Sequence, residues 1–172
     1  MKRLSKKKLL TVIKNTPLIA IDLIIKNKDE EILLGLRTNS PAKNFWFTPG
    51  GRIRKNETIS KAFQRIAFEE LELNLNIEDA KFAGIFEHFY DENFSEKKEF
   101  GTHYVVLAYH LSANIKLKKL PITQHNSYRL EKINILMQNP RVHQNTKNYF
   151  SGSSSNLVGQ FFDKYSISRW PC

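Results

Sequence analysis

The chain has 172 residues, of which 41% are hydrophobic and 12% aromatic, and its 27 basic and 17 acidic residues give a net charge of +10. Such a composition can build a hydrophobic core, which excludes wholesale disorder, and no apolar run approaches the roughly 18 residues that span a bilayer. A single cysteine, Cys172, excludes an internal disulfide and a cysteine-based zinc site. Lys14 interrupts the first apolar run, so no signal peptide is expected and the default prediction is a soluble cytoplasmic protein.

The positive charge is concentrated at the two ends of the chain. Residues 1–15 contain six basic residues and no acidic residue, and residues 141–172 contain four basic residues and one acidic residue. The remaining segment, 16–140, therefore has a net charge of only +1. A protein that binds nucleic acid or an anionic membrane through its fold needs a basic surface on that fold. We therefore expect neither a nucleic-acid partner nor a membrane partner.

The predicted elements begin with a basic N-terminal segment. Residues 4–14 favour a short helix that Pro17 ends, with its lysines in solvent. Strands are expected in runs rich in β-branched, apolar and aromatic residues: Leu18–Ile25, Glu31–Leu36, Phe45–Thr48, Phe82–Tyr90 and Thr102–Leu111. Helices are expected where apolar residues have helical spacing: Ile59–Leu71, Glu131–Met137 and Asn145–Phe150. A Ser/Gly-rich linker then divides the chain into an N-terminal segment (1–15), a domain (16–150) and a tail (151–172), and whether the tail docks is left open.

The helix expected over Ile59–Leu71 has a carboxylate on its apolar side. At about 100° per residue, Phe63, Ile66 and Ala62 lie within about 60° of Ile59, and Glu70 lies about 20° from it. A carboxylate that faces the core needs a compensating charge, and a divalent cation such as Mg²⁺ or Mn²⁺ is an economical solution. The alternative is that Glu70, like Glu69, forms an ordinary surface pair with Arg65.

A longer motif includes this helix. From Gly51 the chain has five residues and Glu57, then seven residues and Arg65, then three residues and Glu69-Glu70. This spacing resembles the Nudix box, G-x5-E-x7-R-E-U-x-E-E-x-G-U, in which U is a bulky apolar residue. Six positions match: Gly51, Glu57, Arg65, Glu69, Glu70 and Leu73. Three positions differ: Ile66 replaces a glutamate, Ala67 is small for its apolar position, and Glu72 replaces the closing glycine. Because glycine favours the left-handed conformation after a helix, Glu72 puts the usual helix-ending turn in question.

Ile66 bears on the mechanism. Most Nudix enzymes attack phosphorus with several metal ions that a fuller set of helix carboxylates holds, so the loss of one carboxylate implies fewer metals. In this respect the chain resembles the GDP-mannose mannosyl hydrolase subfamily. Further blocks resemble that subfamily across residues 16–150: Gly35–Asn39, Phe45–Gly51, Glu87–Asp91, Thr102–Leu107 and Gln124-His125.

The resemblance implies a metal site and a general base. The metal, Mg²⁺ with Mn²⁺ as the alternative, would be held by the Gly50 carbonyl, Glu70 and Gln124, with diphosphate oxygens and water completing the octahedron. His125 corresponds to the general base, and an imidazole that titrates near neutrality suits that role. Considered alone, His125 would be assigned to a surface loop, and its position after Gln124 changes that assignment.

The same resemblance implies a set of substrate contacts. Arg37 and Arg52 correspond to residues that neutralise charge on the departing GDP, and Tyr104 corresponds to a diphosphate contact. Asp22 corresponds to a substrate contact, although a strand end or bulge could also carry its carboxylate to solvent. His88 is either a second polar contact in the pocket or simply a strand histidine.

The implied reaction is hydrolysis of GDP-mannose to GDP and mannose, in which water activated by His125 attacks the anomeric carbon with inversion. Stabilisation of the leaving group is then decisive, and the metal with Arg37 and Arg52 would supply it. Where the subfamily places an aromatic residue against guanine, this chain offers Leu9 and its neighbouring leucines. We therefore expect looser base selectivity, with GDP-glucose as a further candidate substrate.

The resemblance also implies an α/β Nudix fold, a mixed sheet sandwiched between helices, and a homodimer. Two other functions are left open. A phosphorus-attacking Nudix pyrophosphohydrolase is disfavoured by Ile66 and by the Gln124-His125 pair. A non-catalytic, RNA-binding Nudix-like module is disfavoured because the remaining box glutamates are intact.

Overall fold

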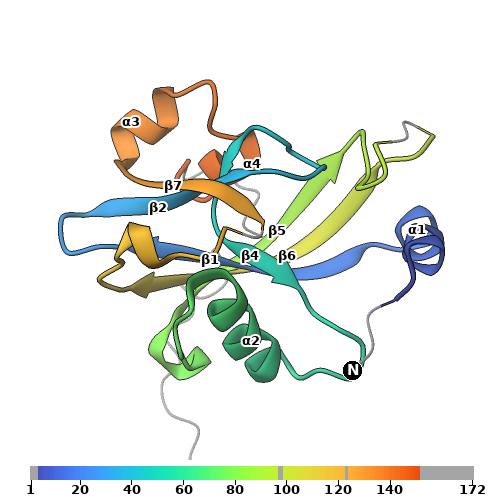
Figure 1. The fold of residues 1–172 in the computed structure, drawn as a ribbon, viewed down its shortest axis with the longest axis horizontal. Helices are drawn as coiled ribbons and strands as arrows, with labels where there is room; N and C mark the ends of the chain where they lie inside the picture. The colour runs from blue at the N-terminus through green and yellow to red at the C-terminus, as the bar shows by residue number, and fades with distance from the viewer. Residues whose placement is uncertain (1–3, 97–98, 123, 152–172) are drawn as a thin grey trace, which may run out of the picture.

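The computed structural model describes residues 4–96, 99–122 and 124–151. Its fold is one mixed sheet with α2 (Ile59–Leu71) on one face and α3 (Ile133–Gln138) and α4 (Gln144–Asn148) on the other (Figure 1). The expected α/β class is therefore confirmed. Residues 152–172 of the predicted tail lie outside the described residues. None of the helices in the described part of the chain combines the length and the hydropathy that a membrane crossing requires.

The sheet has seven strands in the described part of the chain. They are β1 (Leu18–Lys26), β2 (Glu31–Arg37), β3 (Trp46–Phe47), β4 (Gly50–Arg52), β5 (Lys81–Tyr90), β6 (Thr102–Ser112) and β7 (His125–Lys132). The main order is β3-β2-β1-β6-β5, while β4 pairs with β1 and β7 pairs with β2. The sheet is mixed because β1 and β6 run parallel, whereas the other pairs are antiparallel.

The strands β1 and β2 diverge from their hairpin. They pair at Lys26 and Ile32, and farther along β1 pairs with β4 whereas β2 pairs with β3 and β7. The chain crosses between the two halves of the sheet at Pro49, whose carbonyl accepts a 2.8 Å hydrogen bond from the Leu23 amide. The segment from β3 to β4 consequently lies between the two halves.

The strand β1 separates two hydrophobic cores. Ile21 and Leu23 belong to the core that α2 covers, together with Phe63 and Ile66 of that helix. Ala20 and Ile24 belong to the opposite core, whose other members include Trp46, Phe86, Val106 and Leu136. Because successive strand residues face opposite sides, Asp22 lies on the same face as Ala20 and Ile24. The only charged residue in the middle of β1 is thus directed away from α2.

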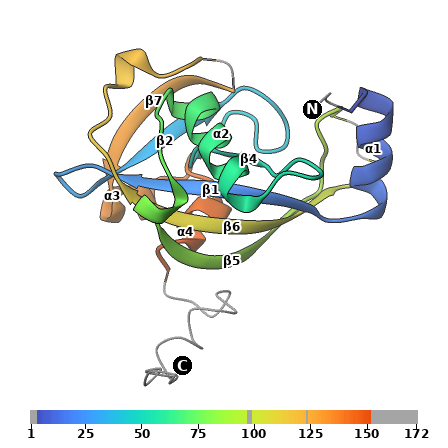
Figure 2. The same cartoon turned by 90° about the horizontal axis from the view of Figure 1, so that it is seen from below.

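The N-terminal helix α1 (Lys6–Asn15) lies at one end of the sheet (Figure 2) and contacts β6. Ser5 caps it, because the Ser5 hydroxyl accepts a hydrogen bond from the Lys8 amide. Leu9 is half-buried on this helix. The short 3₁₀ helices η1 (Ile77–Asp79) and η2 (Leu117–Lys119) complete the described elements.

Three expected boundaries were wrong. The chain forms β7 before α3, so Glu131 and Lys132, which were expected in a helix, pair with β2 instead. The strand expected over Phe45–Thr48 is limited to β3, and β4 follows after Pro49. The last helix is α4 rather than Asn145–Phe150, because the Nδ1 atom of His143 caps it by accepting from the Asn145 amide at 3.1 Å.

The helix α2 spans the residues that its periodicity predicted, and its ending differs from the expectation. Thr58 caps its first turn by accepting from the Lys61 amide at 3.2 Å. The helix-ending turn forms although Glu72 replaces glycine, because Glu72 itself adopts a left-handed conformation with φ 54° and ψ 30°. A residue with a Cβ atom pays a steric cost in this conformation.

Replacing Glu72 by glycine is therefore expected to raise the free energy of unfolding by about 0.5–1 kcal/mol. The gain is smaller than the full left-handed cost because glycine also increases the entropy of the unfolded chain. Urea denaturation measures the change, and Glu72→Ala is the matched control because it removes the charge and keeps the strain. Equal stability of the two variants would contradict the explanation.

Candidate active site

Ion pairs join the loop before α2 to the helix itself. Arg65 forms two hydrogen bonds with the carboxylate of Glu57, at 2.7 and 2.8 Å, and a third with Glu69 at 2.9 Å. Arg54 also pairs with Glu69 at 2.8 Å, and the Arg52 carbonyl accepts from Arg65 at 2.9 Å. Hydrogen bonding to Arg65 lowers the pKa of Glu57. These contacts hold the segment that follows β4 against the helix.

Glu70 differs from Glu69 in its burial and in its contacts. Its side chain is only 3% exposed, and its carboxylate contacts the Gln124 amide and, at 3.4 Å, the Nδ1 atom of His125. Among the described residues, no arginine or lysine forms an ion pair with it. The helical-wheel prediction that Glu70 faces inward is confirmed, whereas Glu69 forms the surface pair with Arg65.

His125 is the first residue of β7 and is 1% exposed, so the alternative of a surface-loop histidine is wrong. Its ring lies on Gly35 of β2, where a Cβ atom would come within 2.5 Å of it. The Tyr128 hydroxyl donates to the Pro121 carbonyl at 2.7 Å and lies 3.4 Å from Nδ1 of His125. A proton on Nδ1 can therefore be shared by the Tyr128 oxygen and Glu70. The Nε2 atom is buried and has no hydrogen-bond partner among the described residues. When Nδ1 carries the proton, Nε2 is the basic ring nitrogen.

The environment of Glu70 suits a divalent cation. A buried carboxylate whose neighbours are an amide and an imidazole leaves its charge uncompensated, which is costly. Gln124 can supply an amide oxygen, and its backbone is held in place because Thr38 donates to its carbonyl through both its amide and its hydroxyl. Gly50 lies on β4, which packs on α2. Among the described residues there is no cluster of three or more histidine, cysteine or acidic side chains suited to a metal, so a cation bound by Glu70 would also need amide, carbonyl and substrate oxygens.

A second polar cluster surrounds Asp22 on the opposite face of β1. Asp22 is 6% exposed, and its carboxylate accepts from the Tyr149 hydroxyl at 2.6 Å and from Thr48 at 3.5 Å. The Nε2 atom of His88 lies 3.1 Å from the same Tyr149 oxygen. Burial, together with the charges of His143 and Arg37, lowers the pKa of His88 to about 3, so this histidine is neutral. Because the Tyr149 hydroxyl donates its proton to Asp22, the Tyr149 oxygen accepts from the Nε2–H group of His88. The alternative in which Asp22 reaches solvent is wrong.

The two clusters are electrostatically coupled. Burial raises the pKa of Asp22 to about 6, the Tyr149 hydroxyl and Arg37 lower it, and the charge of Glu70 raises it further. Gly50 lies beside Asp22, because the two residues pair in the sheet and a Cβ atom at Gly50 would collide with the Asp22 carboxylate. The glycine at this position is therefore a steric requirement of the site.

The raised pKa of Asp22 predicts a pH-dependent effect on stability. The folded state binds the Asp22 proton more tightly than the unfolded state. The contribution of protonated Asp22 to the free energy of unfolding is therefore fully present below pH 4 and is lost as the pH rises through about 6. We expect Asp22→Asn to be more stable than the wild type by about 2–3 kcal/mol at pH 8, and equally stable near pH 4. Denaturation in EDTA at both pH values measures this, and a difference independent of pH would contradict it.

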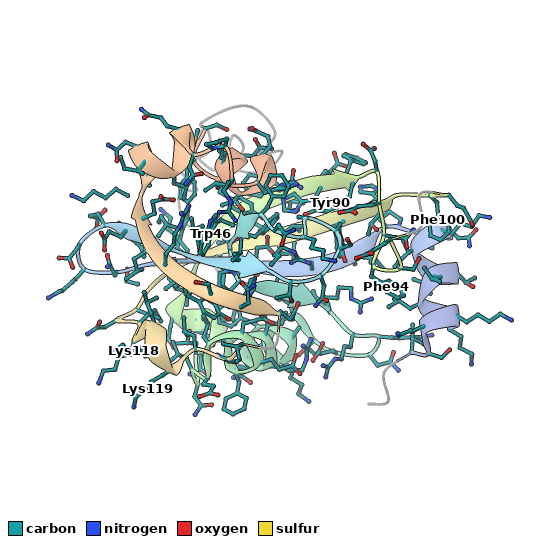
Figure 3. The ribbon with its side chains drawn as sticks, turned by 45° about the horizontal axis from the view of Figure 1, so that its top comes forward. Trp46, Tyr90, Phe94, Phe100, Lys118 and Lys119 are labelled. Carbon is teal, nitrogen blue, oxygen red and sulfur yellow. The ribbon has the colours of Figure 1, made fainter. Side chains whose placement is uncertain are left out.

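Arg37 occupies a central position among these groups. Its charge contributes to lowering the pKa values of Asp22, His88 and His143, and its guanidinium carbon lies 5.6 Å from the centre of the Phe47 ring. Burial raises the pKa of Tyr104, while the charges of Arg52 and Arg37 oppose that rise. Figure 3 shows Lys118 and Lys119 of η2 at the edge of the molecule, well away from Tyr90. Arg37 and Arg52 are therefore the cations whose charges act on Asp22 and Tyr104.

The structure thus brings most of the predicted residues into two groups. Glu70, Gln124 and His125 form one, and Asp22 and His88 belong to the other, with Arg37 beside it. Arg52 is exposed at the end of β4, on the side of Tyr104. Leu9 belongs to neither group.

Sequence reasoning missed Tyr149, Thr38 and Tyr128, although each contacts a predicted residue. Tyr149 is separated from Asp22 by 127 positions in the chain, and no local pattern links them. The only signal for Tyr128 in the sequence was its position three residues after His125.

Comparison with known proteins identifies the family of this chain. Residues 16–148 match the NUDIX domain family. The chain is 37% identical to the low-salt glycan biosynthesis protein Agl8 of Haloferax volcanii over 119 residues, which cover 69% of this chain and 73% of that protein.

Solved structures show the same fold. A MutT NUDIX hydrolase from Burkholderia pseudomallei has a TM-score of 0.63 at 21% identity. The match covers 81% of this chain and 100% of the Burkholderia chain. The MutT protein from Methanosarcina mazei Go1 has a TM-score of 0.60 at 18% identity, covering 87% of this chain and 96% of its own. Hydrolases of this family act on nucleotide derivatives and generally use divalent metal ions. The family match covers most of the length of this chain, and the chain therefore belongs to the NUDIX domain family.

Proposed function

We propose that this protein hydrolyses a GDP-sugar, GDP-mannose or GDP-glucose, to GDP and the free sugar. The observation that supports the proposal most strongly is the convergence of Glu70, Gln124 and His125, with Nε2 of His125 left unpartnered among the described residues. In the tautomer with its proton on Nδ1, an imidazole can take a proton from water through Nε2. The relative from Haloferax volcanii that is named for glycan biosynthesis favours a sugar nucleotide over other nucleotide derivatives.

Each residue has a defined part in the proposed reaction. His125 accepts a proton as water forms a bond to the anomeric carbon, and the bond between that carbon and the diphosphate oxygen breaks with inversion. The electron pair leaves with GDP, and Arg37 and Arg52 stabilise the negative charge that develops there. Asp22 and His88 contact the sugar, and Tyr104 contacts the diphosphate. Leu9 lies nearest to the base in this proposal.

A bound Mg²⁺ ion, or Mn²⁺ in its place, would neutralise diphosphate charge and orient the leaving group, with Gly50, Glu70 and Gln124 as its protein ligands. Ile66 also favours this assignment over attack at phosphorus. It is 1% exposed in the core beneath Gly51, so the box position that could have supplied another carboxylate is apolar packing here.

The position of bond cleavage tests the proposal. Hydrolysis in ¹⁸O-labelled water with Mg²⁺, over a panel of nucleotide sugars, should yield GDP and labelled free sugar. Label in a nucleotide product, or formation of GMP and a sugar 1-phosphate, would show attack at phosphorus and refute the proposed mechanism. The absence of turnover on every nucleotide sugar would refute the proposed substrate class. Homodimer formation is also part of the proposal, and sedimentation of the full chain tests it.

A further inference from the structure

A carboxylate outside both clusters joins two loops beside Arg37. Glu92 follows β5, and its side chain reaches the connection between β2 and β3. Its Oε2 atom accepts from the Ser40 hydroxyl at 3.2 Å, and its Oε1 atom accepts from the Ala42 amide at 3.0 Å. Both oxygens of one carboxylate are therefore used to hold a single short segment of the other loop.

The residue between those two contacts orients Arg37. The carbonyl of Pro41 accepts a 2.9 Å hydrogen bond from the Nε–H group of Arg37. This contact uses the Nε–H group and restricts the plane of the guanidinium, so the terminal nitrogens are left available to bind phosphate oxygens as a planar pair of donors. Glu92 thus holds Ser40 and Ala42, the residues on either side of Pro41, whose carbonyl orients Arg37.

The backbone of this loop needs such external support. Its base is closed at β2 and β3, where the Arg37 amide donates to the Phe45 carbonyl at 3.0 Å. Within it, Ala42 and Asn44 have positive φ values of 63° and 67°. Alanine has no side-chain group that could stabilise a left-handed conformation locally, so surrounding contacts must determine it. The bond from the Ala42 amide to Glu92 is such a contact.

Glu92 is itself attached to a rigid part of the fold. Its carbonyl accepts a 2.9 Å hydrogen bond from the hydroxyl of Thr102, which is the first residue of β6 and is 3% exposed. Thr102 pairs with Tyr90, the last residue of β5. Phe94 and Phe100 mark the connection between these two strands in Figure 3. The end of the β5–β6 hairpin therefore serves as a fixed support for the Glu92 side chain.

We propose that Glu92 is a positioning residue for Arg37: it holds the Ser40–Ala42 segment so that the Pro41 carbonyl orients the guanidinium toward the departing diphosphate. This inference rests on the proposed function, in which Arg37 stabilises the leaving group. Charge on that group develops mainly in the transition state, so a misoriented Arg37 lowers kcat more than it raises KM.

The test uses Glu92→Ala, Glu92→Gln and Lys43→Ala in the full chain. We expect Glu92→Ala to lower kcat on the GDP-sugar by about tenfold to a hundredfold with KM changed less than about threefold. Glu92→Gln should restore most of the rate, because its amide oxygen still accepts from Ala42 and its amide group donates to Ser40. Lys43→Ala is the matched control, because it breaks the 3.0 Å pair with Glu96 between the same two loops without contacting Arg37.

Two further measurements separate positioning from general loop stability. In an Arg37→Met background, Glu92→Ala should cost less than about twofold in kcat, because the residue it positions is absent. In ¹⁵N spectra, the Nε–H signal of Arg37 should be protected from solvent exchange in the wild type and in Lys43→Ala, and should lose that protection in Glu92→Ala.

A full additional loss of rate in the Arg37→Met background would overturn the inference, and so would an equal loss of rate in Lys43→Ala. Unchanged protection of the Arg37 Nε–H group in Glu92→Ala would overturn it as well. This last measurement needs no turnover. If the wild type hydrolyses no GDP-sugar, the proposed function fails, while the spectra still decide whether Glu92 orients Arg37.

Discussion

Replacing His125 by glutamine is expected to lower kcat by about a hundredfold or more while the affinities for GDP and Mg²⁺ change less than about threefold. Glutamine can occupy the space on Gly35 and keep a hydrogen bond toward Tyr128 or Glu70, but it cannot take a proton from water at neutral pH. The loss should therefore appear in the chemical step rather than in binding. Steady-state kinetics and calorimetry on the same preparation measure the two effects.

His110→Gln is the control for this experiment, because His110 lies exposed on β6, outside both polar clusters. It should retain wild-type kcat. A His125→Gln enzyme that keeps more than about a tenth of the wild-type rate would remove His125 from the role of general base, since a positioned base contributes at least about a hundredfold. The buried Nε2 atom would then require a purely structural explanation.

Replacing Glu70 by glutamine is expected to lower kcat/KM by about a thousandfold and to abolish the stabilisation of the fold by Mg²⁺. The buried Glu70 carboxylate is the one box carboxylate that no arginine compensates among the described residues, so it is the one available to a cation. Mg²⁺ should raise the Tm of the wild type through binding to the folded state, and this rise should be absent in Glu70→Gln.

Glu69→Gln is the matched comparison, because Glu69 is the adjacent residue on the same helix and differs in orientation. It loses its pairs with Arg54 and Arg65, which are partly exposed and contribute no more than about 1 kcal/mol of stability. We expect its Tm to rise with Mg²⁺ as in the wild type, and its activity to fall less than about tenfold. The same response to Mg²⁺ in both variants would exclude Glu70 as the principal metal ligand.

Local periodicity predicted α2 and four of the longer strands well. The helix begins and ends at the expected residues, and Glu70 faces inward as its angle on the helix indicated. These features depend on the spacing of apolar residues over a few turns, which is visible in the chain itself. Periodicity failed at β7, whose alternation is weak: only His125 is buried among its residues. This strand exists because β2 offers it a free edge to pair with.

The departures from the family pattern show where a local rule gives way to context. Glu72 occupies a left-handed position that glycine usually fills, and the packing of α2 on the sheet is enough to impose that conformation. Ile66 and Ala67 are 1% and 0% exposed, so both serve the core on the face where the helix meets the sheet. Neither outcome follows from propensity alone, because propensities of single residues are small compared with the free energy of burying a helix face.

The candidate site also combines features that the sequence predicts with contacts that only the fold creates. The residues of the box could be identified in order along the chain, since Glu57, Arg65 and Glu70 are placed by one loop and one helix. The convergence of Glu70 with Gln124 and His125, the hydrogen bond from Tyr149 to Asp22, and the support of the Arg37 loop by Glu92 join segments that lie 50 to 127 residues apart. Sequence by itself determined which chemical groups are present and the helix that presents Glu70. Only the tertiary structure decided which groups meet, because strand pairing and the divergence of β1 from β2 bring distant segments together, and no local spacing encodes those contacts.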